Sequence, residues 1–224
     1  MSYDAVLFDL DGVLVTGYET TPEVYRQATD RLLHAFGQDS SRGWTEALEN
    51  PSSGDAFRDA CAQWDINPDA AWGYRERAAT ELEGERIRAR KRAPFEDTNV
   101  IKPLSQRLAI GICSNNRHQT VADCLDAFDW RQDIQAFRGR FPTLADFDRR
   151  KPNPRYLRWI IDRMDVETPL FVGDRLSDIR TAAAVGCDAA LLTRDGDQPD
   201  AGSTATHTIQ SLNELRSLPD VAQL

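Results

Sequence analysis

Short apolar segments alternate with helix-patterned segments over much of the chain. Apolar runs at residues 4–10, 108–113, 170–172 and 189–193 are bounded by charged or turn-forming residues, which predicts buried strands. Helical spacing of apolar residues follows at 116–128, 154–164 and 176–185, with a weak strand at 206–209 and a last helix at 212–218. Strands that alternate with helices predict an α/β fold, in which helices cover both faces of a parallel sheet.

The segment between the first two predicted strands breaks this alternation. Residues 16–92 show helical patterns at 21–36, 44–49, 55–64 and 69–92 and no strand pattern. The last of these helices has acidic residues early and basic residues late, as the helix dipole favours, so we interpret its basic end as solvated rather than as a phosphate-attracting patch. We therefore predict an α/β core of residues 1–15 and 93–224 and a helical insertion of residues 16–92.

Composition narrows the class of protein. The chain has 224 residues, of which 41% are hydrophobic, and no apolar run approaches the ~18 residues of a membrane span. The first residues lack a basic leader, so we expect a cytoplasmic protein without a membrane partner. A net charge of -9 disfavours nucleic acid as a partner. The four cysteines show no metal-binding spacing and are expected to be reduced.

Among the charged residues, Asp is frequent and Lys is rare. The chain has 25 Asp but only three Lys. Such usage is similar to that of proteins from a salt-rich cytoplasm, where salt screens the repulsion between surface acids. We take a halophilic origin as a hypothesis.

Chemically active residues follow several of the predicted strands. Because the carboxyl ends of parallel strands share one edge of the sheet, these residues are expected to meet there. Taken singly, each has a simpler explanation, such as a turn, a helix cap, a first-turn acid or a surface lysine. Their order along the chain and their complementary chemistry favour one common site. Its candidate members are Asp9, Asp11, Gly12, Ser114, Asn115, Lys151, Asp174 and Asp178.

These residues resemble the four motifs of the haloacid dehalogenase-like (HAD) hydrolase superfamily. The motifs are DxDG from Asp9, a Ser at 114 after the second strand, a lone Lys at 151, and GDxxxD ending at Asp178. The resemblance covers residues 4–14 and about 94–195 and implies a Rossmann-like core. The insertion resembles the all-helical cap of the phosphoglycolate phosphatase and beta-phosphoglucomutase branch.

The chemistry accounts for the acids. An Asp carboxylate is ionised at neutral pH, so Asp9 needs no base to act as the nucleophile toward a phosphate ester. Two anions then approach each other, and Mg²⁺, which prefers oxygen ligands, is expected between the substrate phosphate, Asp9 and Asp174. The resemblance adds the backbone carbonyl of Asp11 as a metal ligand. Asp178 is expected to orient a metal-bound water or to hold Lys151.

The other motif residues are assigned supporting roles. Asp11 is the candidate general acid and base, and Gly12 lets the backbone turn beneath the phosphate. Ser114, together with the start of the following helix, is expected to bind phosphate oxygens, and Asn115 to contact substrate or phosphate. Lys151 would neutralise charge in the transition state.

Two positions depart from the family pattern. Arg175 stands where the family commonly has a small residue, and we interpret it as a surface residue rather than a substrate contact. No acid follows Leu14, so Thr16 and Gly17 are the candidate hinge to the cap.

Four functions remain open at this point. The first is a phosphatase acting on a small phosphorylated metabolite, and the second a phosphomutase that returns the phosphoryl group. A haloacid dehalogenase is disfavoured, because that reaction needs neither a metal nor an acid at position 11. The last is a binding protein on a retired hydrolase scaffold, which the complete set of acids disfavours. The substrate and the oligomeric state are not encoded in any readable pattern.

Overall fold

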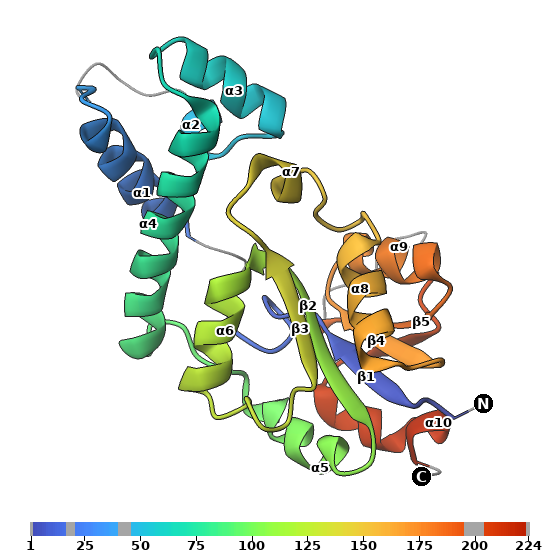
Figure 1. Ribbon diagram of the computed structural model, residues 1–224. Coiled ribbons are helices and arrows are strands. Elements are labelled where there is room, and N and C mark those ends of the chain that lie inside the picture. Colours follow the sequence, from blue (N-terminus) through green and yellow to red (C-terminus); the bar gives the residue numbers. More distant parts are fainter. Residues whose placement is uncertain (1, 17–20, 40–45, 195–203, 223–224) are drawn as a thin grey trace.

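A parallel sheet organises the chain. The computed structural model describes residues 2–16, 21–39, 46–194 and 204–222. Over these residues the sheet has the order β3-β2-β1-β4-β5-β6, and every neighbouring pair is parallel (Figure 1). The strands are β1 Ala5–Phe8, β2 Ala109–Arg117, β3 Ala136–Arg140, β4 Pro169–Gly173, β5 Asp188–Leu192 and β6 His207–Ile209. The strand order turns back between β1 and β4, which is where an open α/β sheet forms its binding crevice.

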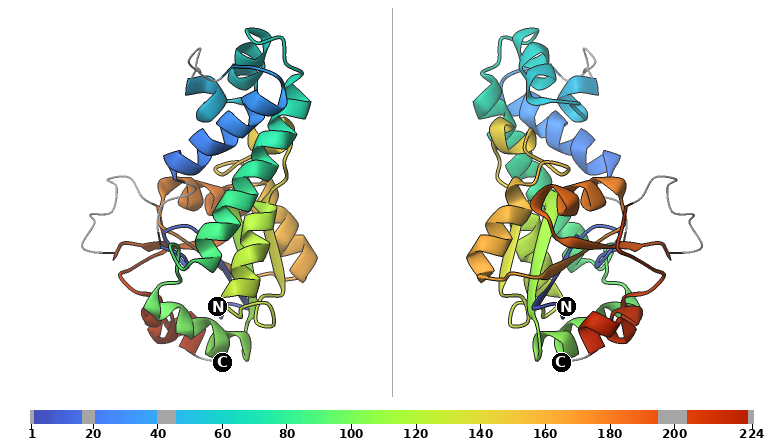
Figure 2. Two further views of the ribbon diagram at one scale, coloured as in Figure 1. Left: turned by 90° about the vertical axis from the view of Figure 1, so that its left-hand side faces the viewer. Right: turned by 90° about the vertical axis from the view of Figure 1, so that its right-hand side faces the viewer.

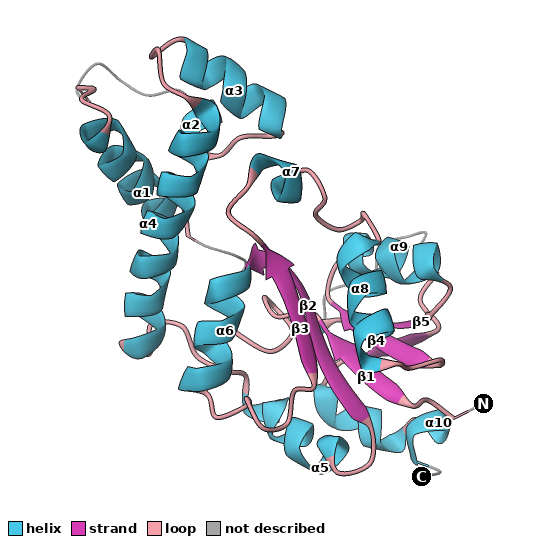
Figure 3. Ribbon diagram, in the orientation of Figure 1, coloured by secondary structure: helices cyan, strands magenta, loops and turns pink. Residues whose placement is uncertain are grey.

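Helices cover both faces of the sheet, as predicted (Figure 3). Successive side chains of a strand point to opposite faces. In β1, Val6 and Phe8 join a core with α5 (Ile101–Ser105) and α6 (His118–Ala127), whereas Leu7 joins a core with α8 (Arg155–Met164) and α9 (Leu176–Val185). Near the end of the chain, a 3₁₀ helix, Leu212–Ser217, and α10, Pro219–Ala222, also pack on the face that contains Val6 and Phe8.

The segment between β1 and β2 is helical, as expected. It contains α1 Pro22–Ala35, α2 Glu46–Glu49, α3 Gly54–Ala62 and α4 Pro68–Arg88. Helices α1 to α3 gather at one end of the molecule, whereas α10 lies at the other (Figure 2). The hydrophobic cluster at this end includes Phe57 of α3 and Trp72 of α4, whose rings pack edge to face with centroids 4.9 Å apart. Helix α4 runs alongside α1 and α6 and so joins the helical segment to the sheet.

Several predicted boundaries are wrong. Strand β2 continues to Arg117, so the helix expected from residue 116 begins at His118. The helix expected to reach residue 92 ends at Arg88, because the backbone turns left-handed at Arg90, where φ is 53°. Strand β3, the 3₁₀ helix Glu96–Val100, α5 and α7 (Leu144–Phe147) were not predicted. Residue 44, the predicted start of a short helix, lies outside the described residues.

Two expectations from composition can be compared with the structure. Within the described ranges, no helix is both long and apolar enough to cross a membrane. The four cysteines are free thiols; Cys61, Cys113 and Cys124 are buried, and Cys187 is half-buried.

Candidate active site

The first acidic motif lies directly beyond β1. Asp9 is buried, and its Oδ1 accepts a hydrogen bond of 2.7 Å from the backbone N–H of Leu10. The chain then turns at Gly12, whose φ of 82° favours a residue without a Cβ. The Gly12 N–H donates to the carbonyl of Val15 at 3.0 Å, which closes the turn. The glycine predicted from the motif is therefore required by the backbone.

Lys151 connects the motifs. Its Nζ lies 2.8 Å from Asp9 Oδ1 and 2.7 Å from Asp178 Oδ1, and it donates to the carbonyl of Cys113 at 3.1 Å. Burial disfavours the charged form of this lysine, but the carboxylates of Asp178 and Asp9 outweigh that cost and raise its pKa. The side chain is thus a fixed cation, and Asp178 holds it, which was one of the two roles expected of that acid.

Three carboxylates converge beside this lysine. Asp9, Asp174 and Asp178 each offer an oxygen, and these three atoms lie within 4.8 Å of one another. Asp178 lies in the first turn of helix α9, where its Oδ2 accepts the backbone N–H of Arg175 at 3.1 Å. A Cβ at Gly173 would lie 2.2 Å from the Cβ of Asp178, so only glycine permits this approach.

The electrostatics of this cluster fit a divalent cation. Burial, with the charge of Asp178, raises the pKa of Asp9 to about 6 despite Lys151. Burial and the charges of Asp9 and Asp178 raise the pKa of Asp174 to about 7. Asp174 Oδ1 is buried and accepts no hydrogen bond from the described residues. Clustered oxygen ligands that repel one another are the donor set that Mg²⁺ prefers.

Asp11 occupies a different environment from these three acids. Its carboxylate is ion-paired with Arg92 and accepts hydrogen bonds of 3.0 and 3.3 Å from Asn116 Nδ2. Arg92 also pairs with Glu83 of α4 at 2.8 Å, and all three charged side chains are buried. The interpretation of the basic end of this helix as solvated is therefore wrong for Arg92. Sequence reasoning missed both Arg92 and Asn116, although Asn116 directly follows the Ser114-Asn115 motif.

The second motif lies within β2 rather than after it. Ser114 is fully buried, and its Oγ accepts the N–H of Asn116 at 3.0 Å. The helix start expected beside Ser114 is displaced to His118, because Arg117 still pairs with Arg140 of β3. Asn115 instead turns toward the lysine: its Oδ1 accepts the N–H of Lys151 at 2.7 Å, and its Nδ2 donates to the Lys151 carbonyl at 3.3 Å.

Comparison with known proteins identifies the family. The model of the haloacid dehalogenase-like hydrolases matches residues 3–186. The chain belongs to this family. Phosphoglycolate phosphatase of Aliivibrio fischeri is 43% identical over 49 residues, 21% of this chain and 22% of that protein. Phosphoglycolate phosphatase of Escherichia coli is 30% identical over 112 residues, 48% of this chain and 43% of the relative. The matches therefore span less than half of these curated relatives.

Solved structures of similar fold match nearly the whole chain. CbbY from Rhodobacter sphaeroides, crystallised with phosphate, has a TM-score of 0.66 at 20% identity and covers 95% of this chain and 96% of its own. A HAD phosphatase from Thermococcus onnurineus has a TM-score of 0.61 at 23% identity, covering 96% of both chains. A putative beta-phosphoglucomutase from Thermotoga maritima has a TM-score of 0.61 at 16% identity, covering 96% of this chain and 99% of its own. These likenesses establish the shared fold.

A small cavity brings together five of the eight predicted site residues of this HAD-like hydrolase, whereas Gly12, Ser114 and Asp174 are not among its lining residues. It is lined by Asp9, Asp11, Asn115, Lys151, Arg175, Ser177 and Asp178. Arg175, which we interpreted as a surface residue, is half-buried and contributes to this lining. The two connections to the helical segment run side by side nearby, since Thr16 N–H donates to the Ala93 carbonyl at 2.8 Å. Gly17, the second candidate hinge residue, lies outside the described residues.

Proposed function

We propose that this hydrolase is a Mg²⁺-dependent phosphatase that acts on a small phosphorylated metabolite through an aspartyl-phosphate on Asp9. The observation that carries the proposal is the position of the Asp9 carboxylate, which contacts the Lys151 ammonium and belongs, with Asp174 and Asp178, to a cluster of oxygens that could hold a metal ion. The curated relatives, which are phosphoglycolate phosphatases, support the reaction class.

The two oxygens of Asp9 would divide their roles. Oδ1 is engaged by Leu10 N–H and Lys151, which leaves Oδ2 to attack the phosphorus. As the new O–P bond forms, the bond from phosphorus to the ester oxygen breaks. Once released from its ion pair with Arg92 and protonated, Asp11 would give a proton to the departing alkoxide, and the resulting carboxylate would accept one from the water that cleaves the aspartyl-phosphate. Lys151 would offset the negative charge on the transferred group.

The acidic cluster would hold the metal. Asp9 and Asp174 are its proposed ligands, with the backbone carbonyl of Asp11 and with Asp178 beside them. Bound Mg²⁺ would neutralise the charge of the phosphate and the carboxylates during attack. Asp178 keeps Lys151 in place through the 2.7 Å contact, so its removal is expected to disturb the lysine as well as the metal.

We further propose that residues 16–92 act as a cap over the site. Two observations support a connection between this segment and the catalytic acids. Arg92 at its end pairs with Asp11, and the peptide at Thr16 is hydrogen-bonded to that at Ala93. In such a design the phosphate chemistry belongs to the core, whereas the leaving group is recognised by the cap.

A panel of small phosphate esters, tested with Mg²⁺ and with EDTA, examines the proposal. Asp9→Asn should lose nearly all release of phosphate while keeping its unfolding transition. Asp4→Asn is the matched control, because Asp4 lies at the other end of β1, where it accepts the N–H groups of Glu167 and Thr168. Equal turnover of Asp9→Asn and the wild type would exclude Asp9 as the nucleophile.

The same panel separates the alternatives. An isomerised sugar phosphate in place of free phosphate would identify a phosphomutase. Turnover of a haloacid that survives EDTA would identify a dehalogenase. No turnover of any ester would favour a binding protein.

A further inference from the structure

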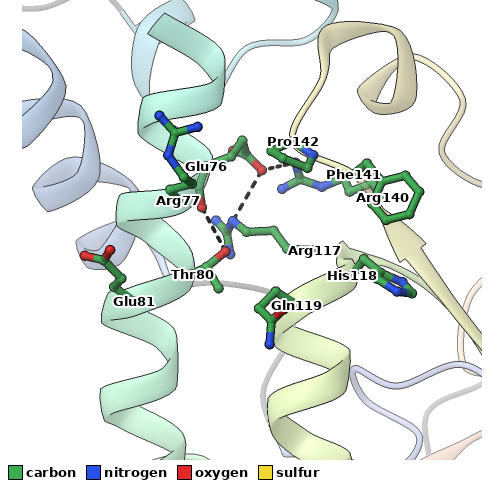
Figure 4. A pocket seen from close by; sticks show the side chains of 10 residues that line it. All are labelled: Glu76, Arg77, Thr80, Glu81, Arg117, His118, Gln119, Arg140, Phe141 and Pro142. Atoms are coloured by element: carbon green, nitrogen blue, oxygen red, sulfur yellow. Dashed lines mark hydrogen bonds and ion pairs between the residues drawn. The ribbon is translucent and has the colours of Figure 1, made fainter. Parts of the chain in front are cut away.

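Arg140 joins the helical segment to the substrate-binding end of β2. It is the last residue of β3, and its side chain is 3% exposed. Its guanidinium is ion-paired with Glu76 of α4 and donates to the Tyr25 hydroxyl of α1 at 3.4 Å. From the same group, Nε donates to the carbonyl of Asn115 at 3.0 Å. Figure 4 shows Arg140 reaching from the end of β3 toward Glu76 on the facing helix.

The contact with Asn115 leads directly to the catalytic centre. The Asn115 side chain exchanges two hydrogen bonds with the backbone of Lys151, at 2.7 and 3.3 Å. The Lys151 ammonium in turn contacts Asp9 at 2.8 Å. Polar contacts, joined through the covalent structures of Asn115 and Lys151, therefore connect Glu76 and Arg140 to the proposed nucleophile.

The backbone explains why a side chain is needed at this point. The register between β2 and β3 shifts between Cys113 and Arg117, so regular ladder bonds do not continue through Asn115. A Cβ at Gly139 would lie 2.6 Å from the carbonyl oxygen of Asn116, which shows how closely the irregular segment packs on β3. Arg140 supplies a donor to a carbonyl in a stretch that the ladder leaves irregular.

An arginine is suited to this double contact. Its planar guanidinium presents several N–H groups in a fixed fork, so one side chain can bind a carboxylate and a carbonyl in different directions. A lysine keeps the positive charge but concentrates its donors on one nitrogen. Burial disfavours the charged form of Arg140, yet the Glu76 carboxylate outweighs this and raises its pKa.

We propose that Arg140 is a positioning residue that couples helix α4 to Lys151 through Asn115. The inference rests on the proposed function, because Lys151 is catalytic only if Asp9 is the nucleophile. Movement of α4 relative to the sheet would pull on Glu76 and Arg140 and so shift the Asn115 peptide that holds the lysine. Placement of the cap would thereby affect the catalytic geometry without any contact between Arg140 and the reacting atoms.

The test compares Arg140→Lys with Arg75→Lys. Arg75 is also buried and pairs with the same Glu76 carboxylate, at 2.7 Å, but it lies on α4 and its contacts are with the helical segment. Both variants retain the charge beside Glu76, so a loss of ion pairing alone should affect them alike. Only Arg140→Lys removes the donor to the Asn115 carbonyl.

Two measurements report on the coupling. Amide exchange at Lys151, whose N–H is held by Asn115 Oδ1, should become faster in Arg140→Lys and stay at the wild-type rate in Arg75→Lys. With an ester that the wild type hydrolyses, kcat should fall at least about tenfold in Arg140→Lys, since a misplacement of ~1 Å can cost ~100-fold. KM and Mg²⁺ binding should change by less than about twofold, because neither depends on the orientation of Lys151 alone.

Failure of the Arg140 coupling can be distinguished from failure of the phosphatase activity. Equal exchange at Lys151 in the two variants would overturn the coupling even if the wild type is an active phosphatase. Faster exchange restricted to Arg140→Lys, in a wild type that hydrolyses no ester, would support the structural coupling and reject the phosphatase. In Asn115→Ala, the further change Arg140→Lys should add little to the loss of kcat, and a fully additive loss would contradict action through Asn115.

Discussion

Removing one charge from the acidic cluster should stabilise the metal-free protein while weakening the proposed metal site. The perturbation is Asp174→Asn, which keeps the shape of the side chain. Asp174 faces the charges of Asp9 and Asp178, and its pKa is raised from 3.8 to about 7 by burial and by these neighbours. A folded state that binds the proton more tightly than the unfolded chain becomes less stable as pH rises through this interval. The penalty is absent at pH values below the unfolded pKa and complete above the folded one.

The size of the effect follows from that shift. About three pKa units correspond to ~4 kcal/mol at ~1.4 kcal/mol per unit, and solvent screening of a partly exposed carboxyl reduces this to about 2 kcal/mol. In EDTA, Asp174→Asn should therefore unfold at higher urea than the wild type at about pH 8, with a smaller gap at about pH 5. With Mg²⁺ the order should reverse, because ligand binding stabilises only the protein that retains its metal site.

Urea unfolding at the two pH values, with EDTA or Mg²⁺, measures all four combinations. Asp148→Asn is a suitable control, because Asp148 lies outside the cluster, where it accepts the N–H of Gly54 at 2.8 Å. If Asp174→Asn is less stable than the wild type in EDTA at the higher pH, the cluster is not under the mutual repulsion described above. If Mg²⁺ stabilises wild type and variant equally, Asp174 is not a ligand.

Three further predictions concern the same chain. Lys151→Met should lose turnover and ~3–5 kcal/mol of unfolding free energy, because Asp9 and Asp178 would lie buried without their cation; a urea midpoint unchanged from the wild type would contradict this. Gly173→Ala should lower the free energy of unfolding by about 1–3 kcal/mol and reduce kcat, because the new methyl would meet Asp178. A kcat equal to that of the wild type would show that the start of α9 can move to make room for the methyl. The unfolding midpoint should rise between low and molar KCl if the -9 net charge reflects a salt-rich habitat, and a flat profile would reject that origin.

The elements that carry the proposed catalytic acids were predictable because their signals are local. Strand β1 is a run of four buried apolar residues, and α9 has the predicted bounds, Leu176–Val185, because Gly186 ends it in the left-handed conformation with φ of 78°. The edge-sharing geometry of parallel strands then placed Asp9 and Asp178 together without any structural information. Local pattern and sheet topology were sufficient for these acids to be expected at one site.

Strand β3 could not be predicted in this way, because its sequence, AFRGR, lacks an apolar alternation. Arg140 is buried and Arg138 is half-buried, and both are paired with acids outside the strand. Arg138 pairs with Asp146 at 2.9 Å and lies 3.9 Å from the ring centroid of Phe141, and Arg140 pairs with Glu76. A charged residue in a sequence is ordinarily assigned to the surface, so burial by distant ion pairs leaves no periodic signal.

Long-range ion pairs also account for the part of the site that sequence reasoning missed. Arg92 and Asp11 are 81 positions apart, and nothing near either residue indicates the other. A buried guanidinium is costly unless it is paired, so each such pair fixes the relative position of two segments more strictly than apolar contact does. Arg92 fixes the return from the helical segment against Asp11, and Arg140 fixes α4 against Asn115. The residues proposed to perform the chemistry are thus positioned by the sheet, whereas Arg92 and Arg140, which hold the helical segment against them, are positioned by charge pairing that only the folded chain reveals.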